Sequence, residues 1–101
     1  MGQFTEKIYE LTKKIPKGKV TTYKILAEAA GTKAYRAVGQ AMGCNPYAPI
    51  VPCHRVVNSN GDVGNYSGKY GVKGKIKILK KEGIKIKNNK IADFEKVLFR
   101  F

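Results

Sequence analysis

Cysteine and histidine stand side by side at Cys53 and His54, in a segment that is rich in proline. A free cysteine has a pKa of about 8.5, so only a few per cent of it is the nucleophilic thiolate at neutral pH. A neighbouring base or nearby positive charge raises that fraction. Most cysteines in small proteins are simply buried apolar residues. Both interpretations stay open for this pair on its own.

Metal chemistry is not expected. His54 is the one histidine, and with Cys44 and Cys53 it cannot complete a four-ligand zinc site. We therefore predict neither metal nor cofactor. Two cysteines do not make a disulfide framework, which favours a reducing, cytoplasmic setting. No signal peptide and no apolar run of about 20 residues is visible, so a membrane is not an expected location.

The charge balance indicates a polyanionic partner. Twenty Lys and Arg against seven Asp and Glu give a formal net charge of +13 in 101 residues. Such a surplus favours nucleic acid or an anionic membrane surface, and we place DNA or RNA first. The alternative is that lysine keeps the protein soluble, as is common at high growth temperature. The length and a hydrophobic share of 43% predict one compact domain.

Three helices are predicted to lie ahead of the Cys-His pair. Apolar residues at helical spacing predict the first, over residues 4–15. Thr21 is a suitable N-cap for a second helix that runs to Ala30, and Thr32 for a third, from Lys33 to about Met42. Two helices joined by a tight glycine-containing turn are typical of a helix-turn-helix.

One face of the third helix carries a single long cation, Arg36, beside Gly39, Gln40 and Gly43. Small residues on such a face let a flat partner approach the backbone closely. The alternative is an ordinary solvated helix face.

The rest of the chain alternates turns with short elements. The segment 45–57 is predicted to be stiff and extended, because prolines exclude a long helix. The turn signal at 58–61 predicts a small hairpin between Val56-Val57 and Val63. A loop should follow over 64–74, then a helix over 75–81 closed by Gly83, and a C-terminal helix over 91–101 that docks on the body. The predicted fold is mainly α with a small β-hairpin.

Five motifs give the chain a family resemblance. Pro52-Cys53-His54-Arg55-Val56 resembles the active-site signature of the O6-alkylguanine-DNA alkyltransferases, or methylated-DNA–protein-cysteine methyltransferases. The other matching segments are Asn45-Pro46, Gly64–Gly68, Val20–Tyr23 and Ala34–Gly39. The match runs from about Phe4 to Ile86, with 87–101 as a C-terminal extension. An N-terminal domain that is usual in the family is expected to be absent.

The resemblance implies a winged-helix-like domain that repairs DNA. It would flip an O6-alkylated guanine into a pocket through the minor groove, since chemistry on a stacked base requires extrusion. Cys53 would accept the alkyl group irreversibly. His54 would take the thiol proton, Glu82 would orient His54, and Asn45 would brace the segment. Tyr23 and the backbone of Ser67 would hydrogen-bond the guanine O6.

The resemblance also implies the contacts around that chemistry. Tyr66 and Val56 would line the base pocket. Arg36 would fill the gap that the flipped base leaves. Thr22 and Gln40 would contact DNA, and Ala34, Ala37 and Gly39 would let the third helix lie close to the groove. The expected partner is duplex DNA containing O6-alkylguanine, bound by a monomer.

Three rival functions differ in what they require. An alkyltransferase-like protein that only binds damaged guanine would lack the reactive cysteine, so the presence of Cys53 weakens it. A helix-turn-helix regulator that senses alkylation or redox state through Cys53 needs base readout, for which only Arg36 and Gln40 are candidates. A thiol hydrolase lacks an evident oxyanion site.

Overall fold

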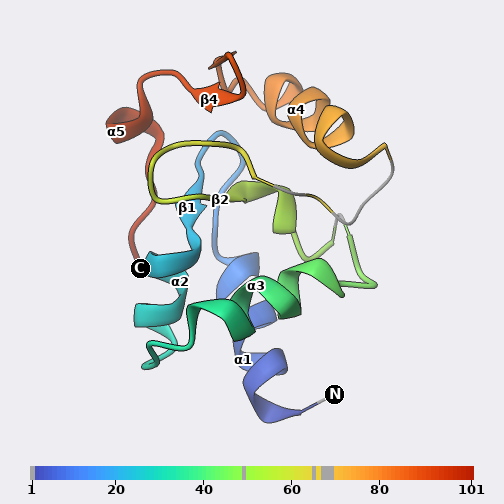
Figure 1. Ribbon diagram of the computed structural model, residues 1–101, viewed down its shortest axis with the longest axis vertical. Coiled ribbons are helices and arrows are strands. Elements are labelled where there is room, and N and C mark those ends of the chain that lie inside the picture. Colours follow the sequence, from blue (N-terminus) through green and yellow to red (C-terminus); the bar gives the residue numbers. More distant parts are fainter. Residues whose placement is uncertain (1, 49, 65, 67–69) are drawn as a thin grey trace.

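The computed structural model describes residues 2–48, 50–64, 66 and 70–101. Helices dominate it, and two small sheets connect them (Figure 1). The helices are α1 (Gln3–Lys13), α2 (Tyr23–Ala29), α3 (Tyr35–Gly43), α4 (Gly71–Lys81) and α5 (Phe94–Val97), with a 3-10 turn η1 (Cys53–Arg55). The strands are β1 (Thr21–Thr22), β2 (Val56–Val57), β3 (Ile86–Lys87) and β4 (Lys90–Ile91). The predicted mainly α fold is confirmed.

Helix α1 forms where the apolar spacing predicts it and ends two residues earlier, at Lys13. Ile8 and Ile15 are buried as expected. Tyr9 and Thr12 are buried as well, because both make hydrogen bonds that satisfy their hydroxyl groups: Tyr9 to the Ala41 carbonyl and Thr12 to the Ile8 carbonyl.

The helix-turn-helix is present, with shifted starts. Thr22, rather than Thr21, caps α2: its hydroxyl accepts a hydrogen bond from the Ile25 amide at 3.0 Å. Gly31, with φ +79°, ends the turn after α2, since a left-handed conformation favours glycine. Helix α3 begins at Tyr35, two residues later than predicted, and the Thr32 hydroxyl accepts from the Ala34 amide just before it.

The predicted hairpin between Val56-Val57 and Val63 is wrong. Strand β2 pairs in parallel with β1, with Thr21 opposite Val56 and Thr22 opposite Val57. Both valines are fully buried, as is usual where helices and loops cover both faces of a parallel pair. The Asn58–Asp62 turn itself exists, closed by a 2.9 Å hydrogen bond from the Asn58 amide to the Asp62 carbonyl.

The hairpin of the structure lies further along, in strands β3 and β4. Asn88 and Asn89 form its two-residue loop, with φ of 53° and 61°. Positive φ at both central positions defines the turn type whose twist suits a tight hairpin, and asparagine tolerates it. Helix α4 begins at Gly71, so part of the predicted 64–74 loop is helical. It ends at Lys81 as predicted, and Gly83, with φ +90°, closes it.

The prediction of a C-terminal helix over 91–101 is wrong except at Phe94–Val97. The chain beyond α5 is extended and pairs with the body through its backbone. The Val20 amide donates to the Val97 carbonyl at 2.9 Å, and the Phe99 amide donates to the Val20 carbonyl at 2.6 Å. The segment therefore docks, but through strand-like hydrogen bonds instead of an amphipathic helical face.

Two apolar clusters fill the molecule. The first lies among α1, α2, α3 and the segment that carries Cys53. The second lies under α4, the hairpin and α5. Strand β2 separates them, because Val56 belongs to the first and Val57 to the second. The turn that bears Cys53 and His54 is thereby fixed between two packed cores. No helix in the described part of the chain is long and apolar enough to cross a membrane.

Candidate active site

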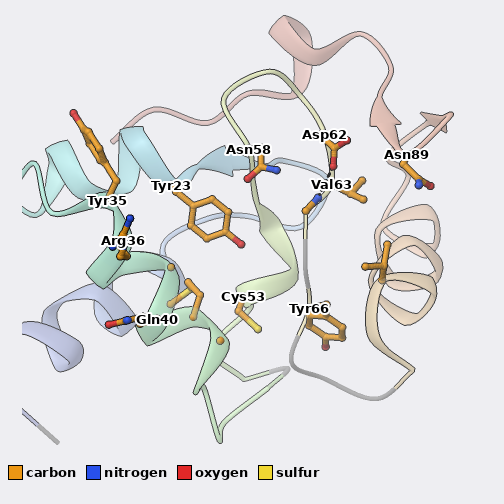
Figure 2. A pocket seen from close by; sticks show the side chains of 15 residues that line it. Tyr23, Tyr35, Arg36, Gln40, Cys53, Asn58, Asp62, Val63, Tyr66 and Asn89 are labelled. Atoms are coloured by element: carbon orange, nitrogen blue, oxygen red, sulfur yellow. Dashed lines mark hydrogen bonds between the residues drawn. The ribbon is translucent and has the colours of Figure 1, made fainter.

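Cys53 lies at a pocket of about 810 Å³ between the helix-turn-helix and the second half of the chain. Figure 2 shows its sulfur between Tyr23 and Tyr66, with α3 on one side and the 62–63 segment and Asn89 on the other. The described lining residues are Tyr23, Tyr35, Arg36, Gly39, Gln40, Met42, Gly43, Cys53, Asn58, Asp62, Val63, Gly64, Tyr66, Val72 and Asn89. Only 4% of Cys53 is exposed, so the thiol meets the pocket and little else.

The segment that presents Cys53 is rigid. In place of the extended chain that the prolines predict, it folds into η1, with the Arg55 amide donating to the Pro52 carbonyl. Buried Asn45 braces this segment: its Nδ2 donates to the Val51 carbonyl at 2.8 Å, and its Oδ1 accepts from the Tyr47 amide at 2.9 Å. Each polar group of that amide side chain is thus used to hold the backbone next to Cys53.

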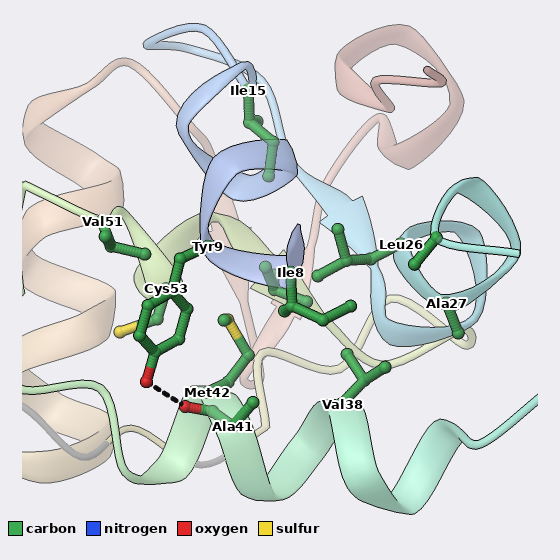
Figure 3. Packing of buried hydrophobic residues seen from close by; sticks show 12 residues of the cluster. Ile8, Tyr9, Ile15, Leu26, Ala27, Val38, Ala41, Met42, Val51 and Cys53 are labelled. Carbon is green, nitrogen blue, oxygen red and sulfur yellow. Dashed lines mark hydrogen bonds between the residues drawn. The ribbon is translucent and has the colours of Figure 1, made fainter. Parts of the chain in front are cut away.

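Apolar side chains close the space behind Cys53. Figure 3 shows Val51, Tyr9 and Met42 of the first cluster around it, with the Tyr9 hydroxyl donating to the Ala41 carbonyl of α3. This packing ties α1 to α3 and leaves the thiol a single open direction, toward the pocket. Both cysteines are free thiols.

His54, which directly follows Cys53 in the chain, pairs with Glu82, 28 residues further on. His54 Nε2 lies 3.1 Å from Glu82 Oε2, and His54 is 2% exposed. An ionised carboxylate only accepts, so Nε2 carries the proton and Nδ1 is left as an acceptor. Nδ1 is buried and has no hydrogen-bond partner among the described residues. The histidine is therefore held in the tautomer that can receive a proton at Nδ1.

Electrostatics favours that protonation state. Burial lowers the pKa of His54, and together with the positive charges of Arg55 and Lys75 it outweighs the raising effect of the hydrogen bond to Glu82 and of that carboxylate's charge. Burial alone would raise the pKa of Glu82, but the hydrogen bonds from Arg55 and His54 hold that pKa below its ordinary value. At neutral pH a neutral imidazole therefore faces an ionised carboxylate.

Arg55 is not among the residues predicted for the site from the sequence, although it belongs to the quoted motif. Its Nε and Nη2 donate to the two oxygens of Glu82 at 2.9 and 2.6 Å, and its Nη1 donates to the Ile15 carbonyl at 2.9 Å. A two-pronged guanidinium–carboxylate pair fixes the plane of the carboxylate. Arg55 therefore aims Glu82 at His54 and links both to the end of α1.

Lys75 is a second residue that the sequence prediction lacks. It is fully buried in α4, and its Nζ donates to the Val56 carbonyl at 2.8 Å. Burial lowers the pKa of Lys75 to about 8, while Cys53 and Asp62 act to raise it. Its position four residues before Leu79, on the buried face of α4, is the signal that could have revealed it.

Tyr23 and Tyr66 flank the sulfur. Burial, together with the proximity of Cys53, raises the pKa of each phenol. Both hydroxyl groups therefore stay protonated and able to donate at neutral pH. Figure 2 shows the Tyr23 hydroxyl directed from the start of α2 toward the open centre of the pocket.

The residues predicted to contact DNA or the base fall into three groups. Arg36, Gly39 and Gln40 line the pocket on α3, as the proposed groove-facing helix surface requires. Ala34 is exposed, and Ala37 lines a separate hollow between α1 and α3. Thr22 and Val56 are buried, with 4% and 0% exposed. Thr22 caps α2, and Val56 pairs with Thr21 between strands β2 and β1. Ser67 lies outside the described residues.

The opposite wall of the pocket contains residues that the sequence gave no reason to select. Asn58, Asp62 and Asn89 come from two turns that the Asp62–Lys90 bridge holds together. Asp62 Oδ1 accepts from the Gly64 amide at 2.9 Å, which shapes the chain leading to Tyr66. Their turn-forming residue types were visible, but the contact between the two turns is a property of the tertiary fold.

Fold and site together define a small helix-turn-helix domain with a buried cysteine at the floor of an open pocket, next to a His–Glu pair. The sequence profile of the "6-O-methylguanine DNA methyltransferase, DNA binding domain" matches residues 3–84. The chain belongs to this family.

Relatives and solved structures agree with that assignment. The methylated-DNA–protein-cysteine methyltransferase of Saccharolobus solfataricus is 48% identical over 83 residues, which cover 82% of this chain and 52% of that protein. The S. pombe Atl1 structure with DNA containing O6-carboxymethylguanine superposes with a TM-score of 0.87 at 30% identity, covering 100% and 98% of the two chains.

A Mycobacterium tuberculosis OGT complex with DNA gives a TM-score of 0.76 at 37% identity, covering 81% of this chain and 50% of that one. The chain thus spans about half the length of the S. solfataricus and M. tuberculosis proteins, and nearly all of the S. pombe one.

Proposed function

We propose that this protein repairs DNA by moving an alkyl group, typically methyl, from O6 of a guanine onto Cys53, once per molecule. The observation that carries the proposal is the placement of a nearly buried thiol at the floor of a pocket large enough to admit a base, adjacent to a His–Glu pair. Pockets of several hundred Å³ suit small planar ligands. The names of the relatives agree with this activity.

The chemistry is a displacement at carbon. The Cys53 proton passes, through a water molecule, to the free Nδ1 of His54, whose other nitrogen is held by Glu82. The thiolate sulfur then attacks the O6-alkyl carbon, forming the S–C bond as the C–O bond breaks. The electron pair stays on guanine O6, where the Tyr23 hydroxyl donates a hydrogen bond. Return of the proton from His54, through water, to guanine N1 neutralises the leaving base, so the products are an S-alkylcysteine and guanine. Because a thioether is stable, the protein does not turn over.

The partner in this proposal is duplex DNA, bound by a monomer through the minor groove. An O6 atom inside the base stack is out of reach of Cys53, so the nucleotide must rotate into the pocket. The surface of α3 that carries Arg36 borders that pocket, which allows its guanidinium to occupy the vacated position in the stack. Since Cys53 must remain a free thiol, we place the protein in the reducing cytoplasm.

The test is intact-mass measurement after incubation with a duplex that contains one O6-methylguanine. We expect a gain of one methyl group, mapped by peptide sequencing to Cys53, and an equal loss of O6-methylguanine from the DNA. Cys53→Ala should gain nothing. Cys44→Ala removes the other thiol, which is exposed, and should react like the unmodified protein.

Binding without transfer is the second candidate, supported by the similarity along the whole chain to the S. pombe Atl1 structure with damaged DNA. In that case the mass of the protein would stay unchanged while it still bound the lesion-containing duplex more tightly than the undamaged one. Methyl on Cys53 rejects this candidate.

A further inference from the structure

Most of the positive charge of this protein lies away from its helix-turn-helix. Residues 70–91 contain eight lysines and one acid, whereas residues 22–44 contain three cations and one acid. The one acid of the first segment, Glu82, is already paired with Arg55 and His54. The region formed by α4 and the β3–β4 hairpin therefore carries an excess charge that the DNA contact at α3 does not use.

The lysines of α4 are ordered along one side of the helix. Lys73, Lys77 and Lys80 are exposed and recur at i, i+4 and i+7, which places them on a single face; we call them the lysine ridge. No acidic group in the described part of the chain forms an ion pair with any of them. Lys81 and the hairpin lysines Lys85, Lys87 and Lys90, all exposed, extend the same positive region.

The ridge is continuous with the pocket. Val72, directly before Lys73, and Asn89, directly before Lys90, both line the pocket that holds Cys53. Figure 1 shows α4 and β4 together at one end of the molecule and α3 nearer the other. A duplex that delivers a base to Cys53 therefore passes next to this positive region.

We propose that the lysine ridge is a second DNA-contacting surface, which binds the phosphate backbone beside the segment that α3 contacts. From Lys73 to Lys80 the helix rises about 10 Å, a length over which one strand of a duplex carries about three phosphates. The chemistry is charge pairing with phosphate, with no base readout, so the contact extends the footprint and strengthens binding to any sequence. The inference rests on DNA being the partner under the proposed function.

Phosphate contacts can be counted from the salt dependence of binding. Each neutralised phosphate adds about 0.9 to the slope of log affinity against log salt. We would compare Lys73→Gln/Lys77→Gln/Lys80→Gln with the matched control Lys7→Gln/Lys14→Gln/Lys96→Gln, which removes the same charge from exposed lysines on α1, its end and α5. Both sets carry Cys53→Ala, and undamaged 24-bp duplex is the probe, so neither transfer nor lesion recognition enters the measurement.

The ridge variant should lose about 2 to 3 units of slope and at least tenfold in affinity at 100 mM salt, and the control variant should lose less than 1 unit. Equal losses in both variants would overturn the proposal, because the lysines would then act only through net charge. An unchanged slope in the ridge variant would also overturn the proposal. The same holds if the ridge substitutions weaken binding to anionic phosphatidylserine vesicles but leave binding to DNA unchanged. Unchanged melting temperatures exclude misfolding.

A second measurement separates this inference from the proposed function. With Cys53 restored, the ridge variant should methylate Cys53 at the unmodified maximal rate on saturating lesion DNA, while the DNA concentration for half-maximal rate rises at least tenfold. Methyl transfer with no change in that concentration would overturn the role of the lysine ridge and leave the proposed function standing. Failure of the unmodified protein to bind DNA would overturn both the role of the ridge and the proposed function.

Discussion

At the scale of single residues, the geometry around His54 decides which ring nitrogen is able to accept a proton. Glu82 accepts a hydrogen bond from Nε2, Arg55 donates two to Glu82, and Nδ1 has no hydrogen-bond partner among the residues that the structure describes. The same third-group logic operates in triads, where the carboxylate selects the tautomer of the base. The carboxylate is itself fixed by two hydrogen bonds from one guanidinium.

Glu82→Gln should slow single-turnover methyl transfer by about 100-fold, within the range that general acid–base catalysis contributes. The direction of the pH dependence of the rate follows from the pKa of His54. Because the folded pKa of His54 is lowered, the rate of the unmodified protein should fall only below about pH 6.5. Glu82 acts to raise that pKa, so the fall in Glu82→Gln should occur at still lower pH. An unchanged rate and profile would show that the pair is only structural.

The lowered pKa of Lys75 predicts that the free energy of unfolding depends on pH. Its pKa in the folded state is about 8, below the ordinary 10.5, so between these values the unfolded chain binds more protons. The free energy of unfolding should therefore rise with pH across this window, by up to about 3 kcal/mol. Urea denaturation at pH 7 to 10 measures it.

Lys75→Met should abolish that rise, whereas Lys77→Met, which replaces an exposed lysine of the same helix, should keep it. A rise of equal size in Lys75→Met would mean that other groups titrate.

At the scale of elements, the C-terminal segment stabilises the helix-turn-helix from outside. Val20, immediately before β1, exchanges two backbone hydrogen bonds with residues 97 and 99, and the Thr21 hydroxyl donates to the Phe99 carbonyl at 2.9 Å. The segment thus fixes the strand that leads into α2 and Tyr23.

Deletion of residues 93–101 should lower the melting temperature by about 5 °C or more, because four hydrogen bonds to residues 19–21 and the apolar contacts of Phe94 and Val97 are lost. Deletion of residues 100–101 alone keeps these hydrogen bonds and should shift the melting temperature by less than half as much. Equal melting temperatures for the full chain and the longer deletion would show that docking contributes nothing to stability.

At the scale of the whole molecule, the proposed function divides the affinity for DNA into two parts. One comes from the net charge of +13 and the other from the pocket at Cys53. Phosphate contacts depend on salt and ignore the lesion, whereas the pocket recognises the lesion and involves no phosphate. Under the proposals above, the two lie on different surfaces of one domain, which would let the protein search undamaged DNA and stop at a base that enters the pocket.

Binding of Cys53→Ala to duplexes with and without O6-methylguanine should therefore give parallel plots of log affinity against log salt. Both affinities should fall at least tenfold from 50 to 200 mM salt. The lesion-containing duplex should bind more tightly by a constant factor. Plots that converge with rising salt would show that lesion recognition itself depends on phosphate contacts.

The sequence by itself determined the features that depend on local chemistry. Helical spacing located α1, and glycines marked the ends of α2 and α4. The Pro52–Val56 motif indicated the family, and the roles it predicts for Cys53 and His54 stay predictions. Such features can be predicted from the sequence because helix caps, glycine conformations and short motifs depend on interactions among a few neighbouring residues.

Only the tertiary structure decided what lies far apart in sequence. Pairing of β2 with β1 replaced the expected hairpin, because two buried valines gained partners 35 residues earlier in the chain. The Arg55 clamp on Glu82, the burial of Lys75 and the contact of the 58–62 turn with the β3–β4 hairpin follow from packing two clusters against one strand. Long-range contacts of this kind depend on which surfaces fit once the chain is compact, and no local pattern encodes that fit.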